Sequence, residues 1–161
     1  MTPLESAIRR AFEEMGGLGR RAALVGGLAV SVRAEPRLTR DADLAVAVEG
    51  DTDAEDLIRS LVGRGYALGA VVEQESVGRL ATSRLIDGQA DVFVNLLFAS
   101  SGIEVEIVEA ADSIEIVDGL RAPVARVGHL IALKLLARDD RHRPADADDL
   151  RHLAEVAVAG D

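Results

Sequence analysis

Two aspartates, Asp41 and Asp43, are the residues whose types and spacing most directly suggest chemistry. They open a stretch, 41–48, that alternates and is rich in Val and Ala, which predicts a β-strand. In a strand, side chains two residues apart project from the same face, with their backbones about 6.6–6.8 Å apart. Two carboxylates placed in this way can bind a hard cation such as Mg²⁺ or Mn²⁺. The alternative is an acidic strand edge that faces solvent.

A pair of glycines, Gly26 and Gly27, precedes these aspartates in the chain. The short apolar run 22–25 before them is predicted to be a buried strand, and 28–34 to be a helix that ends before Pro36. A strand-to-helix turn of this kind offers backbone N–H groups and a helix N-terminus to a phosphate. A tight turn without a ligand is the other interpretation of the glycines.

The segment between the glycines and the aspartates contains Arg37, Thr39 and Arg40. The arginines supply positive charge and Thr39 supplies a hydroxyl group. Phosphate donors followed by two carboxylates on the next strand form the arrangement that an enzyme using a nucleotide and a metal ion requires. The alternative for the arginines is a loop exposed to water.

Lys134 lies within the apolar stretch 129–138, which has helical periodicity. Burying an ammonium group requires a partner of opposite charge. Either the amine faces a charged ligand, or its aliphatic stem covers apolar surface and leaves the amine in water. Asp146 is predicted to cap a last helix, 147–156, and Asp149 is a favourable acid in its first turn.

The composition limits the classes of protein to which this chain can belong. A length of 161 residues favours a single domain, 1–161, and the absence of cysteine excludes disulfides and thiolate metal ligands. The net charge of −10 disfavours nonspecific binding to nucleic acid, and three Phe and one Tyr are too few for a base-stacking platform. A local basic groove remains open, since arginines cluster at 33, 37 and 40 and at 138, 141 and 143. Because no signal peptide or apolar membrane span is evident, we expect a cytoplasmic protein that does not bind membranes.

Helix and strand patterns alternate along the chain. A capping box at Thr2 and Glu5 predicts the start of a first helix, and a second box at Thr52 and Glu55 predicts another. Further predicted strands are 77–86 and 90–98, which form a hairpin around Asp87-Gly88, and a smaller pair, 114–117 and 122–125. The sum is an α/β (α+β) fold, in which helices flank a mixed β-sheet.

These motifs together resemble the DNA polymerase β-type nucleotidyltransferase superfamily, and within it the AbiEii/AbiGii toxin-like nucleotidyltransferases. The segments 24–29 and 37–44 resemble the opening motif of the superfamily. The later segments 96–104, 127–135 and 146–150 also agree with the family pattern. The resemblance spans nearly the whole chain, and it implies the nucleotidyltransferase fold and the transfer of a nucleoside monophosphate from an NTP to an acceptor.

The resemblance also implies roles for individual residues. Two metal ions about 3.5–4 Å apart would clamp the attacking and leaving oxygens of an in-line displacement, with Asp41 and Asp43 as their ligands. Lys134 would face the phosphates. The implied nucleotide-binding residues are Gly26, Gly27, Thr39, Arg40 and Lys134, and the implied catalytic residues are Asp41, Asp43, Asn95, Lys134 and Asp149.

Position 95 departs from the family pattern, which has Asp immediately before the segment 96–98. The amide of Asn95 can coordinate a cation through its oxygen, but it adds no negative charge and cannot act as a base. Asp91, four residues earlier, would lie on the same face of a regular strand and is the alternative third metal ligand. A general base typically contributes about 10²–10⁴-fold to a rate, so its loss predicts a weakened enzyme.

Three hypotheses follow from the sequence. The first is a nucleotidyltransferase that modifies RNA (tRNA-like) or protein, as a toxin with an antitoxin protein as its partner. The second, motivated by Asn95, is a catalytically weakened module that binds nucleotides or mediates an interaction. The third is a structural domain without a ligand, which leaves Asp41, Asp43 and Lys134 without a joint purpose.

Overall fold

The computed structural model describes residues 1–74, 78–137 and 145–159 of the chain. The elements, in chain order, are α1 (Pro3–Gly17), β1 (Ala22–Val25), α2 (Gly26–Arg33), β2 (Ala42–Val46), α3 (Asp51–Gly63), β3 (Tyr66–Gln74), β4 (Arg79–Asp87), β5 (Val92–Leu97), α4 (Glu104–Ala110), β6 (Asp112–Val117), β7 (Leu120–Val124), α5 (Val127–Leu136) and α6 (Ala145–Ala159). The predicted arginine cluster at 138, 141 and 143 lies outside the described residues.

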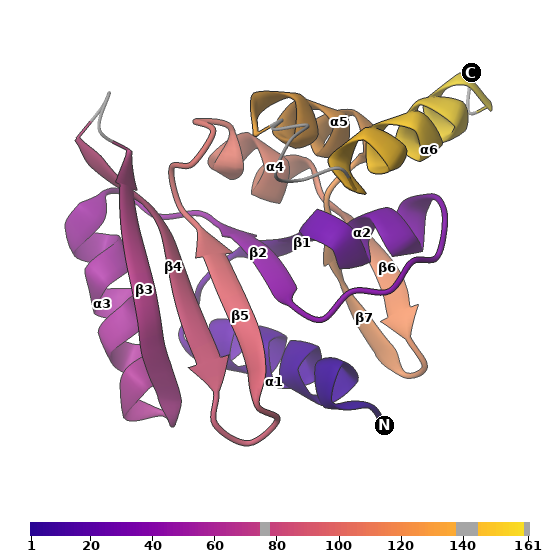
Figure 1. Cartoon of the computed structure of the whole chain (residues 1–161). Helices are drawn as coiled ribbons and strands as arrows, with labels where there is room; N and C mark the ends of the chain where they lie inside the picture. Colours follow the sequence, from indigo (N-terminus) through magenta and orange to yellow (C-terminus); the bar gives the residue numbers. More distant parts are fainter. Residues whose placement is uncertain (75–77, 138–144, 160–161) are drawn as a thin grey trace.

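The strands form one mixed sheet of seven strands in the order β3-β4-β5-β2-β1-β7-β6. Helix α1 packs against β2 and β5, and α3 packs against β3 and β4. Helices α4, α5 and α6 gather at the upper end of the sheet in Figure 1, and α2 contacts both α5 and α6. The predicted mixed sheet flanked by helices is therefore confirmed.

The register of the central strands brings four side chains into one row. Strand β2 pairs antiparallel with β1 and parallel with β5, and β5 pairs antiparallel with β4. Through these pairings, Val25 lies opposite Asp43, Asp43 opposite Asn95, and Asn95 opposite Arg84. Because directly opposite residues project from the same face of a sheet, the last three polar side chains point the same way.

The predicted start of the first helix is confirmed, because Thr2 and Glu5 form the capping box that opens α1. The predicted β4–β5 hairpin is also confirmed, although its turn is longer than a two-residue Asp87-Gly88 turn. Residues 88–91 separate the two strands, and the N–H of Asp91 donates to the carbonyl of Asp87 over 2.8 Å.

The second predicted capping box, at Thr52 and Glu55, is wrong. Helix α3 begins at Asp51, and its N-cap residue, Gly50, makes no side-chain capping hydrogen bond. Asp51 instead accepts a hydrogen bond of 2.9 Å from the backbone N–H of Leu80. The carboxylate that opens the helix therefore ties α3 to β4 rather than capping its own first turn.

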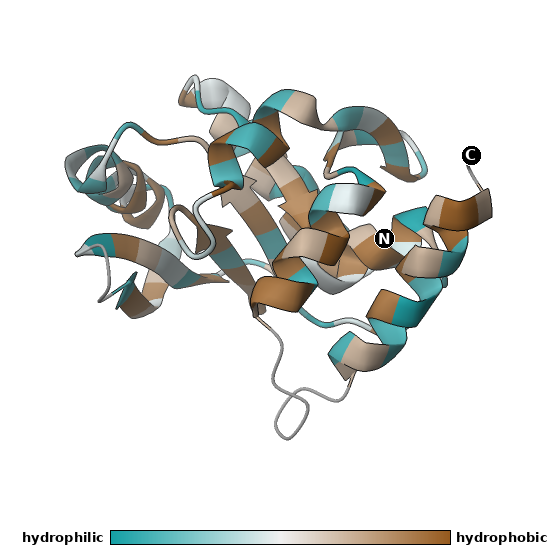
Figure 2. Cartoon of the chain, turned by 90° about the horizontal axis from the view of Figure 1, so that it is seen from above, coloured by the Kyte–Doolittle hydropathy of each residue, from teal (hydrophilic) through white to brown (hydrophobic). Residues whose placement is uncertain are grey.

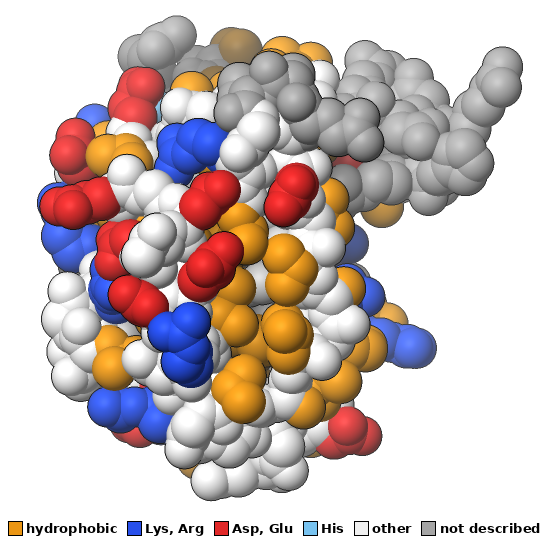
Figure 3. Space-filling view, turned by 90° about the vertical axis from the view of Figure 1, so that its left-hand side faces the viewer, with side chains coloured by type: hydrophobic (Ala, Val, Ile, Leu, Met, Phe, Trp, Pro, Cys, Tyr) orange, Lys and Arg blue, Asp and Glu red, His pale blue; other side chains and the backbone are white. Residues whose placement is uncertain are grey.

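Strand β3 is an edge strand that the sequence pattern did not predict. Its residues from 67 to 73 are exposed, so it lacks the alternation of buried and exposed positions on which a strand prediction depends. Leu68, Val71 and Val72 are exposed on this side of the molecule, where Figure 3 shows apolar side chains gathered on one face.

The core is built almost entirely from Ala, Val, Leu and Ile, as the scarcity of aromatic residues requires. Apolar residues line the strands and the helix faces that meet them, and polar residues lie outward (Figure 2). Among the helices of the described segments, none has the length and apolar character that crossing a membrane would require.

Candidate nucleotide and metal site

The turn from β1 into α2 is built around contact between a glycine and an aspartate. Gly26 follows Val25 directly and has a φ of +68°, a backbone conformation that residues other than glycine rarely adopt. A Cβ atom at Gly26 would lie 2.1 Å from Oδ2 of Asp43. Because Gly26 has no side chain, the backbone at the start of α2 can lie directly against the Asp43 carboxylate.

The second glycine leaves room for the segment that follows α2. A Cβ atom at Gly27 would lie 2.6 Å from Nη2 of Arg37 and 3.1 Å from Oγ1 of Thr39. The hydroxyl of Ser31 accepts a 3.3 Å hydrogen bond from the backbone N–H of Arg37, which holds this segment against the helix. Arg37 and Thr39 therefore lie beside the glycine turn.

Four polar side chains, from β2, β4, β5 and the residue just before β2, form a continuous chain of contacts. Asn95 donates through Nδ2 to Oδ1 of Asp43 over 2.8 Å. Arg84 donates through Nε to Oδ1 of Asn95 over 2.9 Å and through Nη2 to Oδ2 of Asp41 over 3.2 Å. A guanidinium has no acceptor and a carboxylate has no donor, so these partners fix the orientation of the Asn95 amide. Its oxygen faces Arg84 and its nitrogen faces Asp43.

Lys134 is buried on α5 and is paired with two aspartates of α6. Its Nζ lies 2.8 Å from Oδ1 of Asp146 and 3.1 Å from Oδ2 of Asp149. Asp149 also forms an ion pair of 2.9 Å with Nε of Arg37. The expectation that a buried lysine needs charged partners is confirmed, and the alternative of an amine left in water is wrong.

The prediction that Asp146 caps the last helix is also wrong. Helix α6 already begins at Ala145, so Asp146 lies in its first turn, where it is buried and bonded to Lys134. A buried lysine is a stronger partner for this carboxylate than the backbone amides of an exposed helix end.

Two cavities meet at this cluster. A polar cavity of about 570 Å³ is lined by Gly26, Gly27, Arg37, Leu38, Thr39, Arg40, Asp41, Asp43, Arg84, Asn95, Lys134, Ala145 and Asp146. A second cavity of about 290 Å³ shares Gly26, Asp43, Lys134 and Asp146 with the first. The remaining lining of the second cavity is mostly aliphatic, from β1, β5 and α5, with Ser100 and Ser101 beside it. Asp43 and Lys134 therefore stand where a polar space and an apolar space join.

Glu104 holds the Ser100–Gly102 loop at the wall of the smaller cavity, a role that the sequence did not reveal. Its carboxylate is buried and accepts hydrogen bonds from the Ser100 hydroxyl, the Ser101 hydroxyl and N–H, and the Gly102 N–H. Burial by itself raises the pKa of Glu104, but these hydrogen bonds outweigh it and hold the pKa below its ordinary value. An acid followed by an apolar pattern, just after Ser-Ser-Gly, is the signal that could have identified it.

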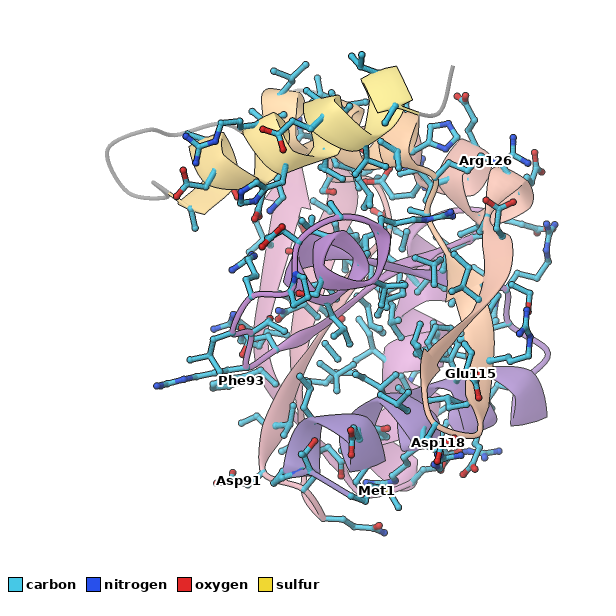
Figure 4. The ribbon with its side chains drawn as sticks, turned by 90° about the vertical axis from the view of Figure 1, so that its right-hand side faces the viewer. Met1, Asp91, Phe93, Glu115, Asp118 and Arg126 are labelled. Carbon is cyan, nitrogen blue, oxygen red and sulfur yellow. The ribbon has the colours of Figure 1, made fainter. Side chains whose placement is uncertain are left out.

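Asp91 is not brought to the cluster, which corrects its interpretation as a metal ligand. It lies in the turn between β4 and β5 with a φ of 55°, so it does not continue the pleat of β5. Figure 4 shows it at the far end of the hairpin from α5 and α6. Three residues of β5, Val92 to Val94, lie between it and Asn95.

The other predicted charges lie at the edges of the site or outside it. Arg40 is exposed and lines the polar cavity at its outer side. Arg33 is bound to Asp112 and to the carbonyls of Val124 and Ala125, so it joins α2 to the β6–β7 hairpin. His129 contacts Glu106 over 3.1 Å.

Solved structures show which class of protein has this fold. The lincosamide antibiotic adenylyltransferase LnuA, bound to lincomycin, is 12% identical, with a TM-score of 0.57 over 94% of this chain and 97% of that one. An antigenic nucleotidyltransferase-like protein from Paracoccidioides brasiliensis is 15% identical, with a TM-score of 0.56 over 93% and 74% of the two chains. A protein from Thermotoga maritima that is proposed to be a nucleotidyltransferase is 16% identical, with a TM-score of 0.57 over 94% and 93%. The fold is that of the nucleotidyltransferases.

The family follows from the sequence. A family profile described as "Nucleotidyl transferase AbiEii toxin, Type IV TA system" matches residues 11–161. This chain therefore belongs to the AbiEii nucleotidyltransferase family, as its glycine and aspartate motifs predicted. No curated protein sequence matches it.

Nucleotidyltransferases generally use divalent metal ions, so the donor set of this chain can be compared with that requirement. Asp41 and Asp43 both line the polar cavity, and a Mg²⁺ ion usually takes only one or two protein carboxylates, with water and phosphate as its other ligands. These residues fit one such ion. Among residues 1–74, 78–137 and 145–159, no group of three or more His, Cys, Asp or Glu side chains is arranged to hold a metal.

Proposed function

We propose that this chain transfers a nucleoside monophosphate from an NTP to an RNA or protein acceptor, in a reaction that depends on Mg²⁺ or Mn²⁺. The observation that carries the proposal is the packing of Asp43 against Gly26, with Lys134 on the same cavity wall. The N-terminus of α2 at Gly26, the Asp43 carboxylate and the buried Lys134 amine therefore all line the polar cavity.

The triphosphate binds in the polar cavity. The backbone N–H groups of Gly26 and Gly27 and the N-terminus of α2 supply hydrogen bonds and partial positive charge to its oxygens. Thr39, whose hydroxyl lies beside Gly27, and Arg40 also line this cavity. Lys134, held by Asp146 and Asp149, supplies a fixed positive charge at the boundary with the apolar cavity.

The apolar cavity receives the nucleoside. It adjoins Asp43 and Lys134 and is walled by Leu97, Leu130 and Leu133. Aliphatic walls with a few polar groups are typical of sites for planar organic ligands. The Ser100–Gly102 loop is held in place by Glu104, so its hydroxyl groups can orient the sugar or base.

Asp41 and Asp43 would hold the divalent ion, which when bound would neutralise charge on the triphosphate and orient it for in-line attack. The acceptor oxygen forms a bond to the α-phosphorus, and the bond from that phosphorus to the bridging oxygen breaks, so pyrophosphate leaves with the electron pair. The acceptor proton passes to water, because the amide of Asn95 cannot accept it. Catalysis rests on positioning and electrostatics rather than on a protein base.

Family membership supports a biological role as the toxin of a type IV toxin–antitoxin system, with an antitoxin protein as partner and the cytoplasm as the place of action. The net charge of −10 favours an acceptor that enters the site locally, such as an RNA end or a protein side chain, over a long nucleic-acid footprint.

The second candidate function is a nucleotide-binding module with little turnover. One observation favours it: the amide nitrogen of Asn95 faces Asp43, at a position where the resemblance implies an acid. This candidate predicts that NTP and Mg²⁺ bind and that no acceptor is labelled.

Labelled NTPs distinguish these functions. The chain is incubated with Mg²⁺, an RNA pool or a protein pool, and each NTP carrying ³²P at the α or the γ position. Nucleotidyl transfer labels an acceptor from the α position only, and Asp43→Asn abolishes the labelling, whereas Asp118→Asn, in the β6–β7 turn, does not. If no acceptor is labelled while calorimetry detects NTP binding, the binding module is the correct function.

A further inference from the structure

Arg84 lies in a row of polar side chains with Asp41, Asp43 and Asn95, which is called the aspartate row below. Neither the motifs nor the proposed reaction assigns a role to this arginine. Its guanidinium reaches Asp41 over 3.2 Å and Asn95 over 2.9 Å, and it lines the polar cavity. The same guanidinium lies 4.5 Å from the ring centroid of Phe93, a cation–π contact. Figure 4 shows Phe93 at the outer side of the sheet.

The surroundings of Arg84 hold its side chain in one direction. Phe93, Asn95 and Asp41 all contact the guanidinium. A planar guanidinium held by several partners loses little further freedom when it binds an oxygen. The side chain is therefore prepared to donate its remaining N–H groups into the polar cavity.

The formal charges show what this residue does to metal binding. Asp41 and Asp43 contribute two negative charges, Asn95 contributes none and Arg84 contributes one positive charge, so the row carries −1. An acid at position 95 without the arginine would give −3. One divalent ion brings the total of this row to +1, which is the total that a row of −3 reaches with two ions, whereas two ions here would bring it to +3.

We propose that the guanidinium of Arg84 takes the place of one of the two divalent ions of the two-ion scheme, so that this chain binds a single ion. The inference rests on the proposed nucleotidyl transfer. Arg84 donates hydrogen bonds to phosphoryl oxygens and to Asp41. The bond changes remain those of the transfer itself, with pyrophosphate leaving and the acceptor proton passing to water.

Counting bound Mn²⁺ tests this inference without measuring activity. Electron paramagnetic resonance of free Mn²⁺ gives the number of ions per chain, with the metal alone and with each of the four α,β-methylene nucleoside triphosphates. Titrations without protein correct for the ion that free nucleotide holds. We expect one ion for the wild type and for Arg84→Lys, and two for the double variant Arg84→Ala/Asn95→Asp.

The single variant Arg84→Ala should bind Mn²⁺ about tenfold more tightly than the wild type, because a positive charge bonded to the proposed ligand Asp41 is removed. Arg79→Ala is the matched control, since it removes an equal charge from the same strand about 17 Å away, and it should leave the affinity unchanged. A role limited to sheet packing would lower the melting temperature of Arg84→Ala without changing Mn²⁺ binding.

Two ions bound by the wild type would overturn the inference, and so would an Arg84→Ala variant that binds Mn²⁺ as the wild type does. These failures are distinct from a failure of the proposed function. A chain that labels an acceptor and binds two ions refutes the role of Arg84 alone. A chain that labels nothing but binds one ion, with the expected response to Arg84→Ala, refutes nucleotidyl transfer alone.

Discussion

Replacing Gly26 by alanine tests how closely the start of α2 must approach Asp43. The substitution adds a single methyl group, at 2.1 Å from Oδ2, 2.7 Å from Cγ and 2.8 Å from Cβ of Asp43. All three atoms are too close, so the clash cannot be relieved by a small rotation of the carboxylate. Either Asp43 turns away from the cavity or the turn opens.

Two terms set the expected size of the effect. A φ of +68° costs an alanine roughly 1–2 kcal/mol, and strained backbone at such sites costs roughly 1–3 kcal/mol in total. For a chain of this length this lowers the melting temperature by roughly 2–12 °C. Displacing the Asp43 carboxylate removes one charge-assisted interaction, about 1.5–3 kcal/mol, which weakens NTP–Mg²⁺ binding roughly 10- to 150-fold.

Thermal unfolding and calorimetric titration with each NTP and Mg²⁺ measure the two effects separately. Gly16→Ala is the control, because a Cβ there meets nothing within 4 Å. Gly27→Ala should cost less stability than Gly26→Ala, since its nearest neighbour, Nη2 of Arg37, is the end of a flexible side chain. The reasoning is refuted if Gly26→Ala is folded and binds the nucleotide as tightly as the wild type.

Three further substitutions have defined outcomes. Lys134→Met leaves the buried carboxylates of Asp146 and Asp149 without their shared cation, and should lower the free energy of unfolding in urea by about 3–5 kcal/mol; a loss below about 1 kcal/mol would contradict this pairing. Glu104→Gln should cost about 1–3 kcal/mol at neutral pH. Because the folded pKa of Glu104 is lowered from 4.5, its stabilisation is complete above that pH and is lost as the pH falls through the folded pKa, so the difference between wild type and variant should shrink in acid. An equal difference at all pH values would refute that assignment. Asp91→Ala should leave the transfer rate and Mn²⁺ affinity unchanged, and a loss of either would restore Asp91 as a ligand.

The parts of the site with local sequence signals could be predicted. Paired glycines between an apolar run and a helix identify the turn from β1 into α2, where Gly26 has a positive φ, and Asp41 and Asp43 fall where the next strand begins. Lys134 was recognisable because a charge within an apolar helix requires partners, although the sequence did not show that Asp146 would serve as a partner rather than a cap.

The parts that depend on long-range register could not be predicted. Arg84 meets Asn95 only because the β4–β5 turn spans residues 88–91; a two-residue turn at Asp87-Gly88 would instead pair Arg84 with Asp91. Strand β3 is absent from the prediction because its exposure removes the alternation that marks a strand.

A crystal structure with an α,β-methylene nucleoside triphosphate and Mn²⁺ tests the central claim most directly, that Gly26, Gly27, Asp41, Asp43 and Lys134 form one nucleotide site. We expect the triphosphate over the first turn of α2, the ion between Asp41 and Asp43, and the nucleoside in the cavity beside Lys134. A nucleotide bound elsewhere, or a metal ion that contacts neither aspartate, would contradict it.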